Sequence, residues 1–323
     1  MMIALGLLLA ALTLAPQNTN DTPEAHVAAA KAAAGDDFQN LFNFQCNGPG
    51  PGGNRGAAGG AQRGQGGGQR QAGPPERSTW HVEPVKVFDN LYFFGQSEYS
   101  AWALTTSQGI ILFDTLFDYS VEDEVADGMK KLGLDPANIK YAVISHAHPD
   151  HDGGGKFLQD HYGTRVIMSP GDWDVLDKRA NGTKPKRDLE AADGQKLTLG
   201  DTTVTLYITP GHTPGTISSI IPVKDNGTSH LIALWGGVGL NPDKESVQKY
   251  IQSGQRFSEI ARQAKADIIL SNHTDWDQSK VNLPILAKRA AGSPNPYIVG
   301  NEKVLKFMKV AQECATSRII GLN

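Results

Sequence analysis

The stretch that decides the fold is Ser145-His146-Ala147-His148-Pro149-Asp150-His151-Asp152-Gly153-Gly154, directly after the apolar run 141–144. Four potential metal ligands, three histidines and one aspartate, fall within six residues of it. An apolar run that stops abruptly is typical of a buried strand, and the loop after it can fold back so that its side chains serve two neighbouring metal positions. Imidazoles with one carboxylate favour Zn²⁺ over Mg²⁺ or Ca²⁺, which prefer oxygen ligands, while iron and manganese remain alternatives.

Two further histidines argue against a solvated loop that binds metal only adventitiously. His212 lies in the Gly/Pro-rich loop 209–216, after the strand-like run 203–208. His273 follows the apolar run 267–270. Each histidine therefore stands at the end of a predicted strand, where side chains from separate loops can converge on one metal centre. His26, His81, His161 and His230 have no such motif around them and are expected to be surface or packing residues.

These motifs resemble the metallo-β-lactamase superfamily, and within it most closely the subclass B3 β-lactamases, over roughly residues 80 to 315. The resemblance rests on two motifs, His-x-His-x-Asp-His from position 146 and Gly-His-Thr-Pro-Gly from position 211. The resemblance implies that His146, His148 and His212 bind a first zinc ion and that Asp150, His151 and His273 bind a second.

The subclass assignment depends on a missing residue. Most hydrolases of the superfamily carry a bridging Asp on the strand between the last two ligand histidines, whereas residues 230–239 contain no carboxylate, with Asp225 and Asp243 flanking them. Subclass B3 enzymes also lack this Asp and tend to hold Ser nearby, where it helps to position the substrate carboxylate. This chain has Gly236 and Gly237 there. We therefore expect Trp235, Gly236 and Gly237 to line the substrate site, β-lactams to be hydrolysed poorly, and Gly237→Ser to improve their turnover.

The rest of the chain alternates strand and helix patterns. Strands are predicted at 85–88, 91–94, 101–105, 110–113 and 141–144 and near 165, 203, 218 and 231, and helices at 121–132, 153–162, 244–264 and 300–314. Two β-halves with outer helices predict an α/β fold, a four-layer αββα sandwich, which the resemblance also implies. Asp114 ends the run 110–113 and is either a hydrogen-bond partner of a ligand histidine or a turn cap.

The expected chemistry is hydrolysis. A hydroxide bridging two zinc ions would attack the carbonyl of an amide or ester, with Asp150 orienting it and later carrying a proton. A B3 β-lactamase-like hydrolase is favoured; alternatives are a lactonase, esterase or thioesterase of the same fold, or an iron-dependent oxidoreductase. A nucleic-acid processor has only the Arg/Gly-rich segment in its favour. The entrance to the site is expected to be lined by aromatic side chains, and the candidates are Phe117, Tyr119, Trp173, Trp235 and Trp276.

The N-terminal sequence predicts that the protein is exported from the cytoplasm. Residues 1–20 contain an apolar run of signal-peptide length, although its start carries no Lys or Arg, and indicate a periplasmic or secreted protein without a stable membrane anchor. Residues 21–46 are an Ala-rich helical segment, 47–78 a Gly/Pro/Arg-rich disordered linker, and 79–323 the catalytic domain. Phe38, Leu41, Phe42 and Phe44 form an apolar end of the Ala-rich segment that is expected to pack on the core. The Gly/Arg-rich tether is expected to contribute few core contacts, so deletion of residues 1–78 should leave metal content and turnover nearly unchanged.

Composition excludes few functions. The 323 residues carry a net charge of −4, which favours a small-molecule substrate over a nucleic acid. The two cysteines, Cys46 and Cys314, are compatible with one disulfide in an oxidising compartment, but sequence distance does not predict that they meet. The oligomeric state stays open.

Overall fold

The computed structural model describes residues 21–48, 73–290 and 292–322. The proposed signal segment 1–20 and most of the Gly/Pro/Arg-rich linker therefore lie outside the described residues. Within the described ranges, no helix combines the length and the apolar character that a bilayer crossing requires.

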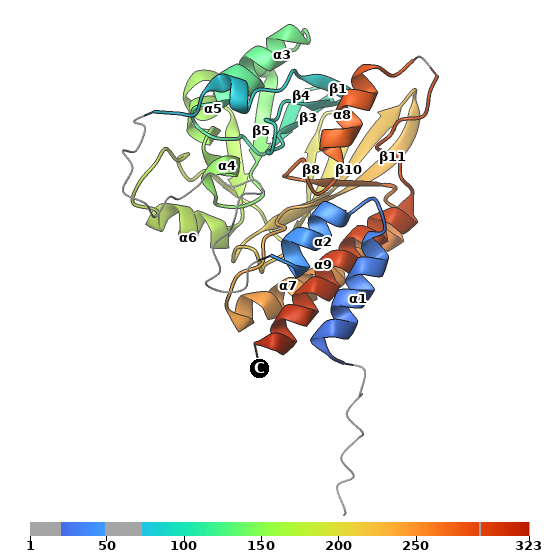
Figure 1. The fold of residues 1–323 in the computed structure, drawn as a ribbon. Helices are drawn as coiled ribbons and strands as arrows, with labels where there is room; N and C mark the ends of the chain where they lie inside the picture. Colours follow the sequence, from blue (N-terminus) through green and yellow to red (C-terminus); the bar gives the residue numbers. More distant parts are fainter. Residues whose placement is uncertain (1–20, 49–72, 291, 323) are drawn as a thin grey trace, which may run out of the picture.

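Two β-sheets form the middle of the molecule (Figure 1). The first sheet has the strand order β1-β2-β3-β4-β5-β6-β7, antiparallel from β1 to β4 and parallel from β4 to β7. The second has the order β12-β11-β10-β9-β8, antiparallel except for the parallel pair β11 and β12. The first sheet consists of β1 (Val85–Phe88), β2 (Leu91–Phe93), β3 (Trp102–Thr106), β4 (Gly109–Phe113), β5 (Ile139–Val143), β6 (Arg165–Met168) and β7 (Leu189–Glu190). The second consists of β8 (Gln195–Leu199), β9 (Thr202–Ile208), β10 (Ile217–Asp225), β11 (Thr228–Trp235) and β12 (Ile268–Ser271).

Helices cover the outer face of each sheet (Figure 1). The first sheet is covered by α3 (Gly128–Lys131) with the π-helical turn Glu122–Asp127 before it, and by α4 (Pro149–Asp152), α5 (Gly155–Tyr162) and α6 (Pro170–Lys178). The second is covered by α7 (Lys244–Ala264) and α9 (Asn301–Gly321). A further helix, α8 (Ser279–Ala287), packs near β1.

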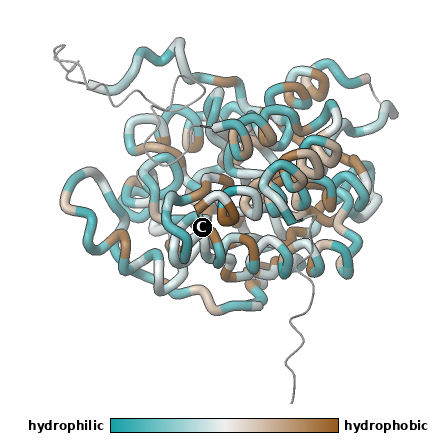
Figure 2. Tube along the Cα trace, turned by 60° about the horizontal axis from the view of Figure 1, so that its bottom comes forward, coloured by the Kyte–Doolittle hydropathy of each residue, from teal (hydrophilic) through white to brown (hydrophobic). Residues whose placement is uncertain are grey.

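Three apolar clusters fill the spaces between these layers. One lies between the two sheets, with Phe113 and Val143 from the first and Ile217 and Ile232 from the second. The other two lie between each sheet and its helices. Hydrophobic and hydrophilic positions accordingly alternate along the helices near the C-terminus in Figure 2. This alternation lets a helix bury one face and expose the other. The two sheets, their outer helices and the clusters between them confirm the predicted αββα sandwich. Helices α6 and α8 were not predicted.

The N-terminal segment is part of the helical layer. Helices α1 (Pro23–Ala34) and α2 (Gln39–Cys46) pack on α9 and bury Phe38, Leu41 and Phe42 there. A disulfide joins Cys46 to Cys314 on α9. The expected packing of Phe38, Leu41 and Phe42 on the core is confirmed, whereas Phe44 keeps 36% of its surface exposed. These contacts argue against the expectation that deletion of residues 1–78 leaves the protein nearly unchanged, because the deletion would remove them together with the tether.

Candidate metal centre

The first group of candidate ligands brings two loops together. His146 and His148 follow β5, and His212 lies in the loop between β9 and β10. Nε2 of His212 lies 3.1 Å from Nε2 of His146 and 3.3 Å from Nδ1 of His148. Three imidazole nitrogens thus point at one position from three directions.

The opposite ring nitrogens fix the orientation of two of these histidines. Nδ1 of His146 donates to the carbonyl of Gly236 at 2.8 Å, and Nδ1 of His212 donates to that of Gly239 at 2.7 Å. Because a carbonyl only accepts, each Nδ1 carries the proton and each Nε2 keeps its lone pair. Burial lowers the pKa of both rings, that of His212 to about 3, so both stay neutral.

The second group lies directly beside the first. The rings of His146 and His151 are 4.2 Å apart. Oδ2 of Asp150 lies 3.1 Å from Nε2 of His151 and 3.7 Å from Nε2 of His273. Asp150 and His151 come from the short helix α4, and His273 follows β12. Burial disfavours a charged Asp150, but the charge of the adjacent His151 outweighs burial and lowers the pKa of this carboxyl.

Asp114 contacts the segment after β5 that carries candidate ligands of both groups. Its backbone adopts a positive φ of 60° at the end of β4. This turn aims the carboxylate at the metal loop, where it accepts from the Ser145 backbone at 2.7 Å and from the Ser145 hydroxyl at 2.9 Å. Its Oδ2 also lies 3.0 Å from Nδ1 of His151. Asp114 therefore holds one ligand ring and the start of the loop that carries the others.

The donor set fits a pair of zinc ions. Nitrogens bound to one tetrahedral zinc at 2.0–2.1 Å are about 3.3 Å apart, close to the spacings of the first group. The second group adds two nitrogens and one carboxylate, and its donor atoms lie within 4.8 Å of one another. His151 is fully buried, and neither of its ring nitrogens makes a well-aligned hydrogen bond. Buried polar atoms in native proteins nearly always have a partner, and a bound ion would supply one to this ring. The structure thus brings together all six residues proposed from the sequence.

Sequence reasoning missed two residues that connect the ligand loops. Asp172, on α6, accepts from the Ala147 backbone at 2.9 Å, the Thr213 hydroxyl at 2.7 Å and the Gly215 backbone at 2.7 Å. Asn272 donates to the Ser145 hydroxyl at 3.0 Å and to the Gly236 carbonyl at 2.8 Å. Asp172 could only be read as a helix-starting residue in the sequence, while Asn272 stands next to His273 and could have been suspected from that position.

The expectation that Trp235, Gly236 and Gly237 line the substrate site is wrong. The Trp235 side chain is 1% exposed and packs in the cluster beneath α7. Gly236 and Gly237 are buried behind the ligands, and a Cβ on Gly237 would lie 2.6 Å from Cβ of His212. The glycines are needed there because the loop passes directly against the ligand ring. Trp173 is also buried.

Other aromatic residues do surround the centre. The Trp276 ring lies 4.2 Å from the His273 ring, and the Tyr99 ring lies 5.1 Å from it on another side. Phe117 packs edge-on against Tyr99 at 5.1 Å and stacks on Tyr119 at 5.0 Å. These rings are all partly exposed, so the mouth of the candidate metal centre has an apolar rim.

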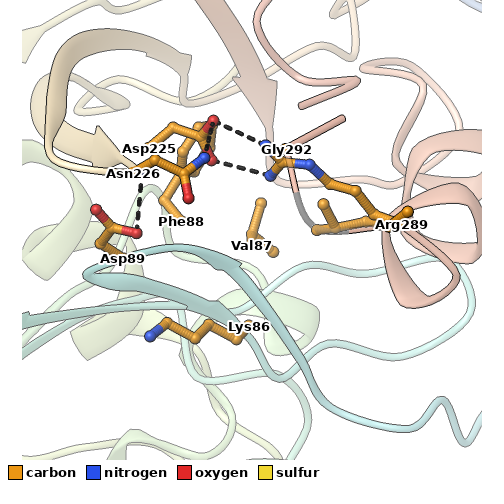
Figure 3. A pocket seen from close by; sticks show the side chains of 10 residues that line it. Lys86, Val87, Phe88, Asp89, Asp225, Asn226, Arg289 and Gly292 are labelled. Carbon is orange, nitrogen blue, oxygen red and sulfur yellow. Dashed lines mark hydrogen bonds and ion pairs between the residues drawn. The ribbon is translucent and has the colours of Figure 1, made fainter. Parts of the chain in front are cut away.

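The two flanking aspartates stay outside the centre. Asp225 ends β10, whereas Ile217 at the other end of that strand bonds to Ser145 of the metal loop. In Figure 3 the Asp225 carboxylate pairs with Arg289, at 2.9 Å, in a hollow beside β1. Asp89, in the same hollow, accepts from the backbone of Asn226. Asp243 caps α7 by accepting from Ser246. Neither Asp225 nor Asp243 therefore substitutes for a bridging carboxylate.

Comparisons with known proteins agree with this geometry. The profile of the family described as Metallo-beta-lactamase superfamily matches residues 95–225. The chain is 26% identical over 180 residues to the N-acyl homoserine lactonase AttM of Azorhizobium caulinodans, a match that covers 47% of this chain and 65% of that protein. It is 29% identical over 111 residues to an N-acyl homoserine lactonase of a Bacillus species, a match that covers 33% of this chain and 42% of that protein. The chain thus spans less than two thirds of the length of these relatives.

Solved structures with the same architecture include two β-lactamases. BJP-1, a subclass B3 metallo-β-lactamase of Bradyrhizobium japonicum, superposes with a TM-score of 0.62 at 28% identity, covering 72% of this chain and 92% of that chain. FEZ-1, a metallo-β-lactamase from Legionella gormanii, superposes with a TM-score of 0.61 at 24% identity, and the match covers 70% of this chain and 91% of that chain. The ligand motifs, the two-sheet fold and the matched profile lead to one conclusion: this chain contains a metallo-β-lactamase superfamily domain.

Proposed function

We propose that this protein is a zinc-dependent hydrolase that opens the amide or ester bond of a small cyclic substrate, in the manner of a subclass B3 β-lactamase. The observation that carries the proposal is the convergence of six donor side chains in two adjacent groups, His146, His148 and His212 beside Asp150, His151 and His273. This donor chemistry suits two zinc ions better than an all-oxygen cation such as Mg²⁺.

The chain's own residues orient the attacking water and the candidate ligand rings. A bound pair of zinc ions would supply Lewis acidity and a nucleophilic water at neutral pH. Asp150 stays ionised, so it can accept a hydrogen bond from the attacking water and orient it. Asp114 and the carbonyls of Gly236 and Gly239 keep three ligand rings in place, so little reorganisation is needed during the reaction.

Lactones are the second candidate substrates. Two curated relatives are named N-acyl homoserine lactonases, and the carbonyl chemistry of a lactone and a lactam is the same. The partly exposed aromatic rim of Tyr99, Phe117, Tyr119 and Trp276 favours a substrate with an apolar group beside the ring.

We also propose that the protein works outside the cytoplasm. The Cys46–Cys314 disulfide supports an oxidising compartment, because such bonds are rare in cytosolic proteins. This agrees with the predicted signal segment at residues 1–20.

The experiment combines metal analysis with a substrate panel. Protein purified without added metal is analysed for zinc, iron and manganese, and then assayed with a penicillin, a carbapenem, an N-acyl homoserine lactone, an aryl ester and a thioester. We expect about two zinc ions per chain, and hydrolysis of a lactam or lactone. His273→Ala should lower the zinc content to about one ion and abolish hydrolysis. The control is His161→Ala, an exposed residue on α5, which should change neither the zinc content nor hydrolysis. Retention of two tightly bound zinc ions in His273→Ala would refute the assignment of the second group, and an iron-loaded, non-hydrolytic protein would refute the function.

A further inference from the structure

An aromatic side chain from the N-terminal segment reaches the rim of the metal centre. Phe44, near the end of α2, stacks on Trp276 with ring centroids 4.6 Å apart and ring planes 29° apart. Trp276 in turn lies against His273 at 4.2 Å. Phe44 keeps 36% of its surface exposed, although α2 buries the neighbouring Leu41 and Phe42. The three rings therefore form a continuous surface from a candidate metal ligand out to the solvent.

This surface is held rigidly on the domain. Nε2 of Gln45, the residue after Phe44, donates to the Val238 carbonyl at 2.6 Å and to the Tyr250 hydroxyl at 2.8 Å. Cys46 is tied to Cys314. Phe44 is thus followed directly by two residues anchored to different elements, which leaves its backbone little freedom to move away. A preorganised aromatic surface loses little entropy when it binds a ligand, so it can contribute strongly to affinity.

Other aromatic side chains around the candidate metal centre extend this apolar surface. Tyr99 also packs on His273, with ring centroids 5.1 Å apart, and Phe117 and Tyr119 follow Tyr99 in a chain of ring contacts. Burial raises the pKa of Tyr119, and the nearby carboxylates of Asp118, Asp150 and Glu98 raise it further. Tyr119 therefore stays an uncharged phenol, and a substrate chain at this rim meets neutral aromatic side chains.

We propose that Phe44 and Trp276 form the wall that binds a neutral apolar acyl group of the substrate, and that Phe44 sets the preference for acyl-chain length. The substrate part of this inference rests on the proposed hydrolase function. Each methylene buried against the wall strengthens binding about three- to fourfold, so a chain long enough to pass Trp276 and reach Phe44 gains affinity that a short chain cannot.

The test compares chain lengths in Phe44→Ala. N-butanoyl and N-decanoyl homoserine lactone are assayed with the full-length, zinc-loaded protein. We expect Phe44→Ala to lower the decanoyl-to-butanoyl ratio of kcat/KM about tenfold, mainly through KM, while Phe44→Leu retains part of the ratio. The matched control is Asn43→Ala, one residue earlier on the same helix and exposed, which should leave the ratio unchanged. Zinc content and Tm are measured for each variant. An unchanged ratio in folded, zinc-loaded Phe44→Ala would overturn the proposal.

A binding measurement separates this inference from the function itself. Calorimetric titration of butanoate and decanoate into the zinc-loaded protein requires no turnover. The wall predicts a steep gain in affinity with chain length in the parent protein and a smaller gain in both Phe44→Ala and Trp276→Ala. If neither lactone is hydrolysed but this chain-length dependence is found, the hydrolase function fails and the apolar wall stands. If affinity depends on chain length equally in the parent protein and in the variants, the proposed wall is refuted, whatever the hydrolysis assays show.

Discussion

At the scale of single residues, Asp172 connects two loops of the candidate metal centre. One carboxylate holds the loop of His146 through Ala147 and the loop of His212 through Thr213 and Gly215. Asp172→Ala would leave buried backbone donors unpaired at a cost of about 1–3 kcal/mol each. We expect a lower Tm and a clearly weaker zinc affinity, measured by chelator competition. The control is Asp174→Ala, exposed on the same helix. Unaltered zinc affinity in Asp172→Ala would show that the two loops hold their positions without it.

Gly237 gives a second prediction at this scale. A side chain at this position would collide with the His212 ring, since even the Cβ would lie within 2.9 Å of two ring atoms. We therefore expect Gly237→Ser to reduce zinc affinity and the turnover of every substrate together. This replaces the sequence-based expectation of a selective gain for β-lactams. Zinc content and the lactam-to-lactone ratio of kcat/KM check it: a selective gain for lactams would contradict the packing seen here.

The convergence of the six candidate ligands could be predicted from sequence, because each lies near the end of a predicted strand. His146, Asp150 and His151 fall in one stretch, and the loop around His212 carries its own Gly/Pro signature. Asp172 could not be predicted in the same way, because its partners lie 25 and 41 residues away in sequence. The position of Gly237 behind His212, rather than at the mouth, depends on how the sheets stack, and that information is not local either.

At the scale of elements, the turn between β12 and α8 contains a buried acid. Asp277 accepts from the Ser271 backbone at 2.8 Å and from the Ser279 backbone at 2.9 Å. Burial raises the pKa of Asp277 to about 7. The folded protein therefore binds a proton here that the unfolded chain releases at about pH 4. The contribution of Asp277 to stability is largest below that pH and declines as the pH rises towards 7.

Asp277→Asn isolates this contribution. Between pH 4 and 7 the free energy of unfolding should decline with pH more steeply in the parent than in the variant, by at most about 1.4 kcal/mol per pH unit. Denaturant titrations of the metal-free proteins at several pH values measure the difference, so that zinc release does not contribute. A difference between the two proteins that does not vary with pH would show that Asp277 ionises at its ordinary pKa.

At the scale of the whole molecule, the αββα order could be predicted because strand and helix patterns alternate twice along the chain. The packing of Phe38, Leu41 and Phe42 on the core could also be predicted from their apolar pattern. Their partner could not be predicted, because it is α9, at the other end of the chain. The sequence allowed a disulfide between Cys46 and Cys314 but could not show that they meet, because 268 residues separate the two cysteines. Contacts between chain ends depend on the completed fold.

The packing of α1 and α2 makes a final prediction that reverses the expected tolerance to N-terminal deletion. Removing residues 1–48 would uncover the face of α9 that contacts Leu41, Phe42 and Ala30, and would remove the disulfide. Fully burying one large apolar side chain contributes about 1.5–3 kcal/mol, and losing a native disulfide costs about 2–5 kcal/mol in small domains. We expect the truncated protein to aggregate or to unfold at a much lower Tm. Leu41→Ala, which keeps the disulfide, should lose about 2–5 kcal/mol, while Lys31→Ala on the exposed face of α1 should lose almost nothing. A truncated protein that folds, binds zinc and hydrolyses a short-chain substrate like the parent would show that α1 and α2 are accessory to the sandwich.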